Sequence, residues 1–361
     1  MTSNTIPFTD FETFGIPQTE AEVLKALRSD SFSYQQYLAL TESMQQDFLS
    51  FCMGTKGAKL TYDPFFKSVF DPQKYPQRLE DFLSLCLGVK LSIVAVLPGE
   101  SDRLSEEGSL LIMDILVRLE SGALVNVEIQ RIGYYFPGPR CACYSSDLVM
   151  RQYSRVRSDM KKKGKRFSYR DIKKVYTIVL IQSSTSEFHL FPDQYLHYAK
   201  QCFDTGLPLD LIQEYLIIPL DIFLSCPHNK LTRLDAWLYF IASDAPADIL
   251  RVIGEYPDFK DLYREVFQFR FMTKELVSMF SEGLRLLDAG TVQYMIEDQQ
   301  AQIEQLQLKL KQQQEWAEQQ RERAEQQRAQ AEQAVRQQAQ AAEALAEKEA
   351  EIVRLKALLA K

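Results

Sequence analysis

Between residues 61 and 185, apolar residues recur at the spacing of a helix in some segments and at the spacing of a strand in others, in an ordered series. Apolar residues recur at helical spacing over residues 76–87, where Pro76 suits the first turn of a helix. Short alternating or β-branched runs then predict three strands, followed by a longer helix and a fourth strand. We expect the strands at residues 91–97, 110–119, 124–130 and 175–181, and the second helix at about residues 140–157. The pattern predicts an α/β core with the order helix, three strands, helix, strand.

The segments on either side of this core have a helical pattern. Residues 1–60 are expected to form a helical N-terminal extension, with a capping box at Thr19 and Glu22 and a second helix at about residues 34–51. Residues 186–292 are expected to form a mainly helical region that packs on the core. Within it, Leu234, Trp237 and Leu238 have the spacing of a buried helical face.

From residue 293 to the end, Gln, Ala, Glu and Arg dominate and neither Gly nor Pro occurs, which predicts one long helix. Its two ends carry apolar residues at the a and d positions of a heptad repeat, whereas the middle has Gln and Arg where a seam needs apolar side chains. These apolar residues are Ile303, Leu306 and Leu310, then Leu345, Ile352, Leu355 and Leu359. We expect a coiled coil that joins copies of the chain into a homo-oligomer; a solvated single helix is the alternative.

Composition and charge narrow the classes of protein. The chain has 361 residues, of which 46% are hydrophobic and 11% aromatic, enough for a sizeable buried core. A formal net charge of -7 argues against nucleic-acid binding over the whole surface, so any such contact must be local. No apolar run reaches the about 20 residues that span a bilayer, and the start lacks a charged-then-apolar signal. We therefore expect a cytoplasmic protein with no membrane contact.

The six cysteines and three histidines do not favour a structural metal site. Only Cys141 and Cys143 lie close together, and no Cys-x-x-Cys pair occurs. A redox or metal pair is one interpretation of these two residues. Small buried thiols in a reducing compartment are the favoured one.

The residues that carry chemistry lie in the predicted hairpin of residues 110–119 and 124–130. Side chains alternate between faces of a strand, so Glu128 and Gln130 share one face. If the turn is centred on Ser121, residues paired across the hairpin have numbers that sum to 242, and Asp114 faces Glu128. Paired residues on one face lie about 5 Å apart. A two-residue turn would instead put the two carboxylates on opposite faces.

Two carboxylates this close in an apolar hairpin repel each other, and a divalent cation would remove the conflict. Mg²⁺ (or Mn²⁺) binds carboxylates and keeps water positions, which leaves room for a phosphate oxygen and an attacking water. Asp114 and Glu128 are therefore the candidate metal ligands. Gln130 is a candidate to orient the water or hold a phosphate oxygen, and Glu80 to assist the metal or accept a proton. The alternative is that both acids are rim residues paired with arginines of the same strands.

Two basic features follow the hairpin. The residues Arg140, Tyr144, Asp147 and Arg151 recur on one helical face, as a polar stripe that suits a nucleic-acid backbone. Beyond them, seven Lys and Arg residues between positions 155 and 166 are opposed by a single acid; they include Lys161, Lys162 and Lys163. Such a loop binds phosphates in a salt-sensitive way. A solvated helix face and a solvated loop are the alternatives.

These ordered segments resemble the PD-(D/E)XK nuclease superfamily, and more narrowly its family of transposases, also called recombination-promoting nucleases of the Rpn type. The matching stretches are residues 62–67, 109–116, 126–134, 136–153 and 169–180, all within the core of residues 61–185. Residues 234–240 and 279–295 resemble the tails of such proteins. The resemblance implies a restriction-endonuclease-like fold, a mixed sheet flanked by helices, and Mg²⁺-dependent cleavage of DNA.

The resemblance also assigns roles to individual residues. The family's aspartate, glutamate, third motif position and helical acid fall on Asp114, Glu128, Gln130 and Glu80. Many members of the superfamily have Lys at the third position, whereas Gln is usual in the Rpn type. Because Gln is uncharged, the resemblance implies that Arg131 or Arg140 supplies positive charge.

Three functions remain open from the sequence. The first is a metal-dependent DNA endonuclease that hydrolyses phosphodiester bonds, with the tail joining two active sites for two strands. The second is a catalytically weak or inactive DNA-binding protein of regulation or defence, assembled by the same tail. The third is a scaffold without a nucleic-acid role. Metal-dependent cleavage that requires Asp114 and Glu128 would separate the first from the other two.

Overall fold

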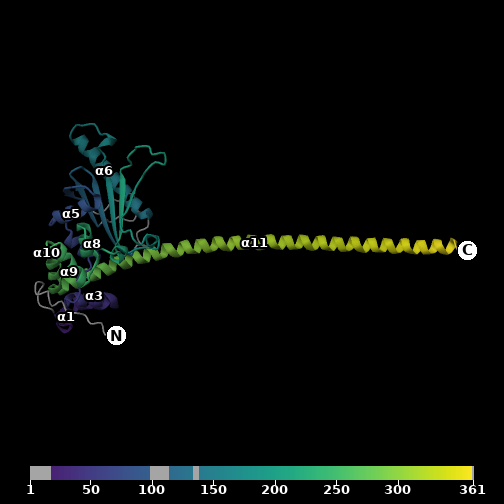
Figure 1. Ribbon diagram of the computed structural model, residues 1–361, viewed down its shortest axis with the longest axis horizontal. Helices are drawn as coiled ribbons and strands as arrows, with labels where there is room; N and C mark the ends of the chain where they lie inside the picture. Colours follow the sequence, from purple (N-terminus) through teal and green to yellow (C-terminus); the bar gives the residue numbers. More distant parts are fainter. Residues whose placement is uncertain (1–17, 98–113, 133–137, 360–361) are drawn as a thin grey trace. The chain divides into compact units, whose positions relative to one another are not determined.

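A six-stranded mixed sheet organises the part of the chain before residue 293 (Figure 1). The computed structural model describes residues 18–97, 114–132 and 138–359. The strands are β1 (Ile93–Val96), β2 (Ile115–Leu119), β3 (Leu124–Ile132), β4 (Val175–Ser183), β5 (His197–Lys200) and β6 (Gln213–Pro219). Their order in the sheet is β1-β2-β3-β4-β6-β5. The central strands β3, β4 and β6 are parallel, whereas β1, β2 and β5 pair antiparallel with their neighbours.

Helices pack against both faces of this sheet. The α-helices are α1 (Glu20–Arg28), α2 (Ser31–Ala39), α3 (Glu42–Cys52), α4 (Asp63–Val69), α5 (Pro76–Leu87), α6 (Gly138–Lys162), α7 (Leu220–Ser225), α8 (Arg233–Ala242), α9 (Pro246–Glu255), α10 (Phe259–Gln268) and α11 (Thr273–Leu359). On one face, Val125, Val127 and Ile129 of β3 join a large apolar cluster with most of the other helices. On the opposite face, α6 contributes Tyr144 and Leu148 to a smaller cluster. The alternation of β3 thus divides its side chains between two cores.

The predicted order of helix, three strands, helix and strand is confirmed as α5, β1, β2, β3, α6 and β4. The bounds of α5 are those expected, whereas β3 runs two residues further, to Ile132, and α6 extends to residues 138–162. Positions 110–113 of the expected second strand lie outside the described residues. The core therefore has the α/β architecture that the pattern predicts.

The sheet continues beyond residue 185, the expected end of the core. Strands β5 and β6 extend it within a region expected to be mainly helical. Strand β6 is an interior strand that is apolar on both faces, so it lacks the alternation that identifies a half-buried strand. Strand β5 is a largely exposed edge strand of four residues, which leaves almost no hydrophobic signal.

The N-terminal helices differ from the expectation at one point. The capping box of Thr19 and Glu22 is present at the start of α1. The helix expected at residues 34–51 is two helices, α2 and α3, because Leu40 is extended and the Thr41 side chain accepts a hydrogen bond from the N–H of Met44. An N-cap threonine satisfies a donor that an uninterrupted helix would use internally, so it begins a new helix.

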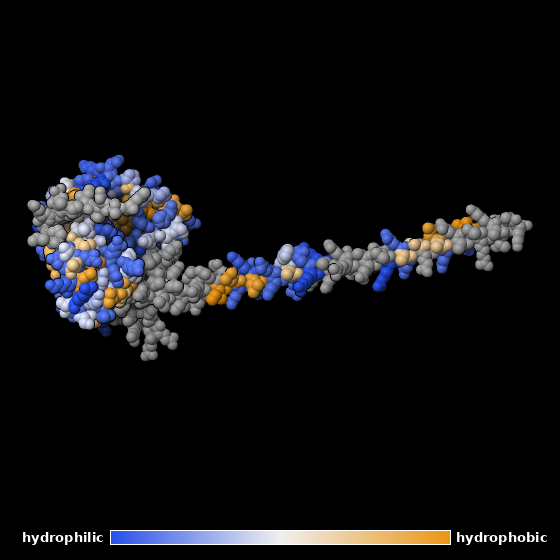
Figure 2. Space-filling view, turned by 90° about the horizontal axis from the view of Figure 1, so that it is seen from below, coloured by the Kyte–Doolittle hydropathy of each residue, from blue (hydrophilic) through white to orange (hydrophobic). Residues whose placement is uncertain are grey.

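Residues 293–361 form a second unit of the chain. Its described residues are helical as predicted, and they belong to α11, which begins at Thr273. Figure 2 shows apolar side chains gathered at two places along this helix, with polar side chains around each of them. The seam residues Ile303, Leu306, Leu310, Leu345 and Ile352 are all at least half exposed. No described helix is long and apolar enough to cross a membrane.

Candidate active site

The hairpin of β2 and β3 has the register that the sequence predicted. Ile115 pairs with Val127, and every further pair has numbers that sum to 242. The turn of residues 120–122 is an odd loop, with Gly122 at a φ of 89°, a conformation that L side chains rarely adopt. Asp114, directly before β2, therefore comes to lie beside Glu128 of β3.

Asp114 and Glu128 are held together by hydrogen bonds that cross between their strands. The backbone N–H of Asp114 donates to Oε1 of Glu128 at 3.3 Å. In the other direction, the N–H of Ile129 donates to Oδ2 of Asp114 at 2.8 Å. Each carboxylate thus accepts a backbone hydrogen bond from the strand that carries the other, which fixes both on one side of the hairpin. We call these two residues the acid pair.

Burial makes the negative charge of the acid pair costly. Glu128 is 1% exposed, and the side chain of Asp114 is 13% exposed. Burial, and next the charge of Asp114, raise the pKa of Glu128 well above its ordinary value. A hydrogen bond from Asn126 at 2.9 Å and the charge of Arg140 oppose this rise. A residue this buried is not a rim residue, so the alternative that placed both acids at the rim is wrong for Glu128.

The donor set of the acid pair fits a hard divalent cation. Carboxylate oxygens are the ligands that Mg²⁺ and Mn²⁺ prefer, and a cation would offset the like-charge repulsion that burial magnifies. Among the described residues, no group of three or more His, Cys, Asp and Glu side chains is placed so that it could hold a metal ion by itself. Protein ligands from Asp114 and Glu128 would thus leave the remaining positions to water and a phosphate, as Mg²⁺ sites commonly do.

Lys67 is a residue of the candidate active site that the sequence did not predict. It lies on α4, and its Nζ is 3.3 Å from Oδ1 of Asp114. Its side chain is 38% exposed, so the ammonium group reaches the acid pair from the solvent side. Its only signal in the sequence is its place at the end of residues 62–67, a stretch that resembles the nuclease family. Lys67 brings a positive charge to an acid pair whose neighbour Gln130 has none.

Gln130 occupies the position expected for it. It follows Glu128 by two residues on β3, so both side chains lie on the face that α6 covers, and Gln130 is half-buried opposite Ile181 of β4. The arginines expected to supply charge divide between the two faces. Arg131 lies with its guanidinium carbon 4.3 Å from the ring centroid of Tyr62, on the opposite face of the strand, whereas Arg140 acts electrostatically on Glu128.

The structure does not bring Glu80 to the acid pair. Its Oε1 accepts a hydrogen bond of 2.7 Å from the N–H of Ile93, and Ile93 lies opposite Leu119. Leu119 is five residues along β2 from Asp114, which corresponds to about 17 Å at strand spacing. Glu80 therefore anchors the start of β1 on α5, and the mapping of the superfamily's helical acid onto it has no geometric support.

The predicted polar stripe of α6 is turned toward the sheet. Tyr144 is 2% exposed and accepts a hydrogen bond of 3.0 Å from Arg140. Asp147 is also buried and pairs with Nε of Arg151 at 2.7 Å. Buried side chains cannot lie along a nucleic-acid backbone, so the expected contact role does not suit Tyr144. Arg140 and Tyr144 of the stripe instead lie on the covered side of the acid pair, where burial, and next the charge of Glu128, raise the pKa of Tyr144.

The remaining sequence features have simpler outcomes. Lys161, Lys162 and Lys163 are exposed at the end of α6, as a phosphate-binding loop requires. Cys141 is buried and Cys143 exposed, and neither forms a disulfide bond. Burial, together with the charge of Glu128, raises the pKa of Cys141 to about 12, so this thiol stays protonated at neutral pH.

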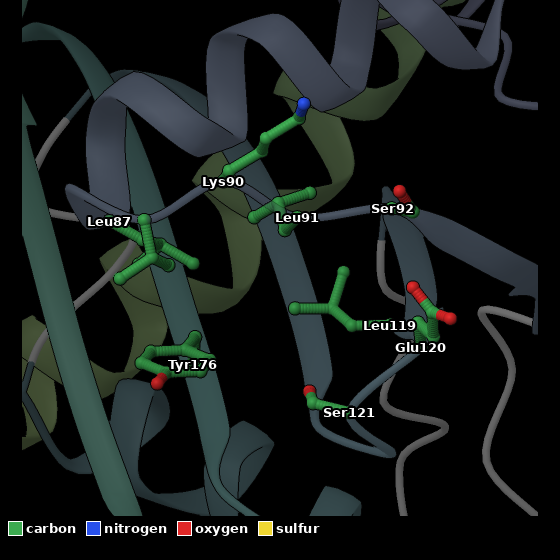
Figure 3. A pocket seen from close by; sticks show the side chains of 9 residues that line it. Leu87, Lys90, Leu91, Ser92, Leu119, Glu120, Ser121 and Tyr176 are labelled. Atoms are coloured by element: carbon green, nitrogen blue, oxygen red, sulfur yellow. The ribbon is translucent and has the colours of Figure 1, made fainter.

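A surface hollow of about 680 Å³ lies at the other end of the hairpin (Figure 3). Leu87, Leu119, Glu120 and Tyr176 are among the residues that line it. It opens beside the turn of residues 120–122, five residues along β2 from Asp114, so it is separate from the acid pair.

Comparison with known proteins identifies the family of this chain. A model of the PD-(D/E)XK nuclease family transposases matches residues 60–291, which include all six strands, the acid pair and Lys67. Searches of curated proteins and of solved structures found no match. The match covers well over half of the chain, and the family resemblance expected from the sequence is confirmed. The chain belongs to the PD-(D/E)XK nuclease family transposases.

Proposed function

We propose that this protein is a metal-dependent DNA endonuclease of the Rpn type, with the acid pair as its reaction centre. The observation that carries the proposal is the buried Glu128 held beside Asp114. A fold gains nothing in stability from two adjacent carboxylates in a low-dielectric site, because their repulsion is strongest there. A bound cation gives both side chains a function, and the family supports nuclease chemistry.

Asp114 and Glu128 would hold the ion, Mg²⁺ (or Mn²⁺) by its preference for carboxylate oxygens. Such an ion supplies a hydroxide-like water near neutral pH and charge stabilisation for a phosphoryl oxygen. Asn126 donates to Oε1 of Glu128 and keeps that carboxylate oriented toward Asp114. Preorientation of ligands through neighbouring hydrogen bonds strengthens metal binding.

Lys67 and Gln130 divide the work of a third motif position. Lys67 carries the positive charge, and its Nζ is 3.3 Å from Oδ1 of Asp114. From there it would also reach a phosphate oxygen bound at the acid pair. Gln130 is neutral and has one carbonyl and one amide group, which suits it to orient a water or to donate to a phosphate oxygen. Arg140, whose charge acts on Glu128, adds to the positive field at the site.

DNA is the substrate class that the family suggests, and the exposed Lys161, Lys162 and Lys163 are the residues that we assign to phosphate contacts. We assign the tail of residues 293–361 to self-association, because the seam residues from Ile303 to Ile352 are exposed along one long helix. Two copies would present two reaction centres to the two strands of a duplex.

The decisive assay is relaxation or linearisation of supercoiled plasmid by the purified full-length protein. We expect cleavage with Mg²⁺ or Mn²⁺ and none in excess chelator. Asp114→Ala and Glu128→Ala should each abolish it, whereas Glu120→Ala should not. Glu120 is a matched control, since it is an exposed acid in the turn of the same hairpin.

Each result of that assay bears on a different function. Cleavage that survives in a correctly folded double variant of Asp114 and Glu128 would show that the reaction centre lies elsewhere. DNA binding without metal-dependent cleavage in the wild-type protein would replace the nuclease by a DNA-binding protein with a nuclease fold. Absence of both would point to a scaffold whose working part is the tail.

A further inference from the structure

Three aromatic rings pack together on the solvent side of α6, near the exposed lysines. Tyr153 comes from α6, Phe167 from the segment after it, and Tyr169 from the 3-10 turn of residues 169–171. The Tyr153 and Tyr169 rings are stacked, with centroids 6.2 Å apart and an interplanar angle of 14°. Phe167 meets both rings edge-on, at 5.4 Å and 5.2 Å. We call these three residues the aromatic platform.

The outer ring of the platform is open to solvent. Tyr169 is 77% exposed, because its ring is offset from the nearly parallel ring of Tyr153 and covers little of it. A ring that only anchors the loop would be largely buried, whereas Phe167 is the partly buried member of the three and meets both tyrosine rings edge-on. The Tyr169 ring therefore presents most of its surface to solvent, where another ring can stack on it.

Positive charge surrounds the aromatic platform. Arg157 donates a hydrogen bond of 3.0 Å to the hydroxyl of Tyr153, with its guanidinium carbon 5.8 Å from the ring centroid. The exposed Lys165, Arg166 and Arg170 flank Phe167 and Tyr169 in sequence, and Lys161, Lys162 and Lys163 precede them. Two acids lie nearby in the sequence. Asp171 accepts a hydrogen bond from the N–H of Ser168 and so caps the 3-10 turn, and Asp159 lies on α6, one helical turn before Lys163. The local balance is strongly cationic.

This combination matches the chemistry of a single strand of nucleic acid. Exposed aromatic rings bind unpaired bases by stacking, and adjacent cations bind the phosphates between them. A base inside a duplex is already stacked on its neighbours and has no free face. We propose that Tyr169, supported by Tyr153 and Phe167, is a stacking site for an unpaired base of single-stranded DNA. The choice of DNA rests on the proposed function.

The position of the platform on α6 also favours an unpaired strand. Tyr144 lies beside Glu128, and Tyr153 is nine residues further along the helix, about 14 Å at helical rise. Nine residues are also about two and a half turns, so Tyr153 points away from the side that faces the sheet. A rigid duplex at the acid pair could not place a base on Tyr169 without disruption, whereas a flexible single-stranded end can pass around the helix.

The test compares binding of a fluorescent single-stranded oligonucleotide and of its duplex by anisotropy, in excess chelator so that no metal-dependent cleavage occurs. Tyr169→Ala should weaken single-strand binding about tenfold, because stacking on one ring is lost. Tyr169→Phe should bind within about twofold of wild type, while Tyr169→Leu should resemble Tyr169→Ala. Duplex binding should change less than twofold in all three variants.

Two controls make the outcome specific. Phe32→Ala removes a ring that is 71% exposed on α2, outside any basic loop, and should change neither affinity. Neutralising Lys161, Lys162 and Lys163 together should weaken both single-strand and duplex binding. The proposal is overturned if Tyr169→Ala leaves single-strand affinity unchanged, or if it weakens both DNA forms equally.

Failure of this proposal is distinguishable from failure of the proposed function. Selective loss of single-strand binding in Tyr169→Ala supports the stacking site even if the protein cleaves no DNA. Metal-dependent plasmid cleavage by wild type, together with unchanged single-strand binding in Tyr169→Ala, would keep the nuclease and remove the stacking site.

Discussion

At the scale of single residues, Glu128 determines how the site behaves with pH. Its carboxyl group is buried beside Asp114, and its folded-state pKa is well above the ordinary value of 4.5 that holds in the unfolded chain. Between these two pKa values the folded protein binds more protons than the unfolded one. The contribution of Glu128 to stability therefore falls as pH rises through that window, starting near 4.5, and the loss is complete above the folded-state pKa.

Glu128→Gln should raise the melting temperature of the metal-free protein. The substitution removes the buried charge and keeps an oxygen that can accept the hydrogen bond from Asn126. Calorimetry in chelator at pH 8 should show the variant melting a few degrees above wild type, since 1 kcal/mol shifts the melting temperature of a large domain by at most about 2–4 °C. The difference should shrink as pH falls toward 4.5. Identical melting temperatures at every pH would show that Glu128 is not destabilised by its charge.

Lys67→Ala should lower the cleavage rate by about 10²- to 10³-fold, the loss typical of one group that stabilises developing charge. Its ammonium group stands 3.3 Å from Asp114, on the side open to solvent. DNA affinity in chelator should change little. The double variant Lys67→Ala with Gln130→Lys should recover part of the rate, because it returns one positive charge to the neighbouring strand. A single variant as fast as wild type would remove Lys67 from the site.

The sequence predicted the acid pair but not Lys67, for a physical reason. Periodicity and turn length relate residues that are close in the chain, so they could place Asp114 opposite Glu128. Lys67 belongs to a helix that precedes β2 by more than 40 residues. Its contact with Asp114 depends on how α4 packs on the sheet, which no local pattern encodes. The same limit misplaced Glu80, whose helix position was right and whose partner is Ile93.

At the scale of elements, the odd turn of the β2–β3 hairpin sets the register that joins the acid pair. Gly122 adopts a φ of 89° there, and a Cβ on it would lie 3.1 Å from the side chain of Lys173. The turn was predictable because Ser121 and Gly122 interrupt two apolar runs. The direction in which this face of α6 points was not predictable. Its stripe of Arg, Tyr and Asp is polar by composition, yet it packs on the sheet, with Tyr144 beside the buried Glu128.

Gly122→Ala should destabilise the protein by roughly 1–2 kcal/mol, because an L side chain is strained at positive φ. Thermal melting should report a decrease of a few degrees, with the strand register kept. Gly254→Ala is the matched control: Gly254 lies in α9, has nothing within 4 Å of an added Cβ, and should gain about 0.5–1 kcal/mol from helix propensity. Equal effects of the two substitutions would contradict the strain argument.

At the scale of the whole molecule, the chain combines a sheet-based unit of residues 1–292 with a helical unit of residues 293–361. The composition predicted the second unit as a helix, because it has no Gly or Pro and is rich in helix formers. The sequence was less informative for β5 and β6, which complete the sheet with an exposed edge strand and an interior strand that does not alternate. Their place depends on pairing between distant segments.

Self-association through the tail should depend on the seam and not on hydrophobicity in general. Leu306 and Leu310 occupy d and a positions, whereas Leu308 lies between them on the other side of the helix, and all three are more than half exposed. Light scattering should find an oligomer for wild type and for Leu308→Glu, but a monomer for Leu306→Glu combined with Leu310→Glu. A monomeric wild type, or equal effects of the seam and Leu308 substitutions, would rule out the coiled coil.

The most direct measurement is the anomalous scattering of Mn²⁺ in crystals of the wild-type protein and of Glu128→Gln. We expect a peak within about 2–2.5 Å of carboxylate oxygens of both Asp114 and Glu128 in wild type, a distance usual for such ligands. The peak should be lost or much weaker in the variant. The acid pair would not be the metal site if the manganese peak lay elsewhere and only protein groups bridged Asp114 and Glu128, while cleavage still required the metal.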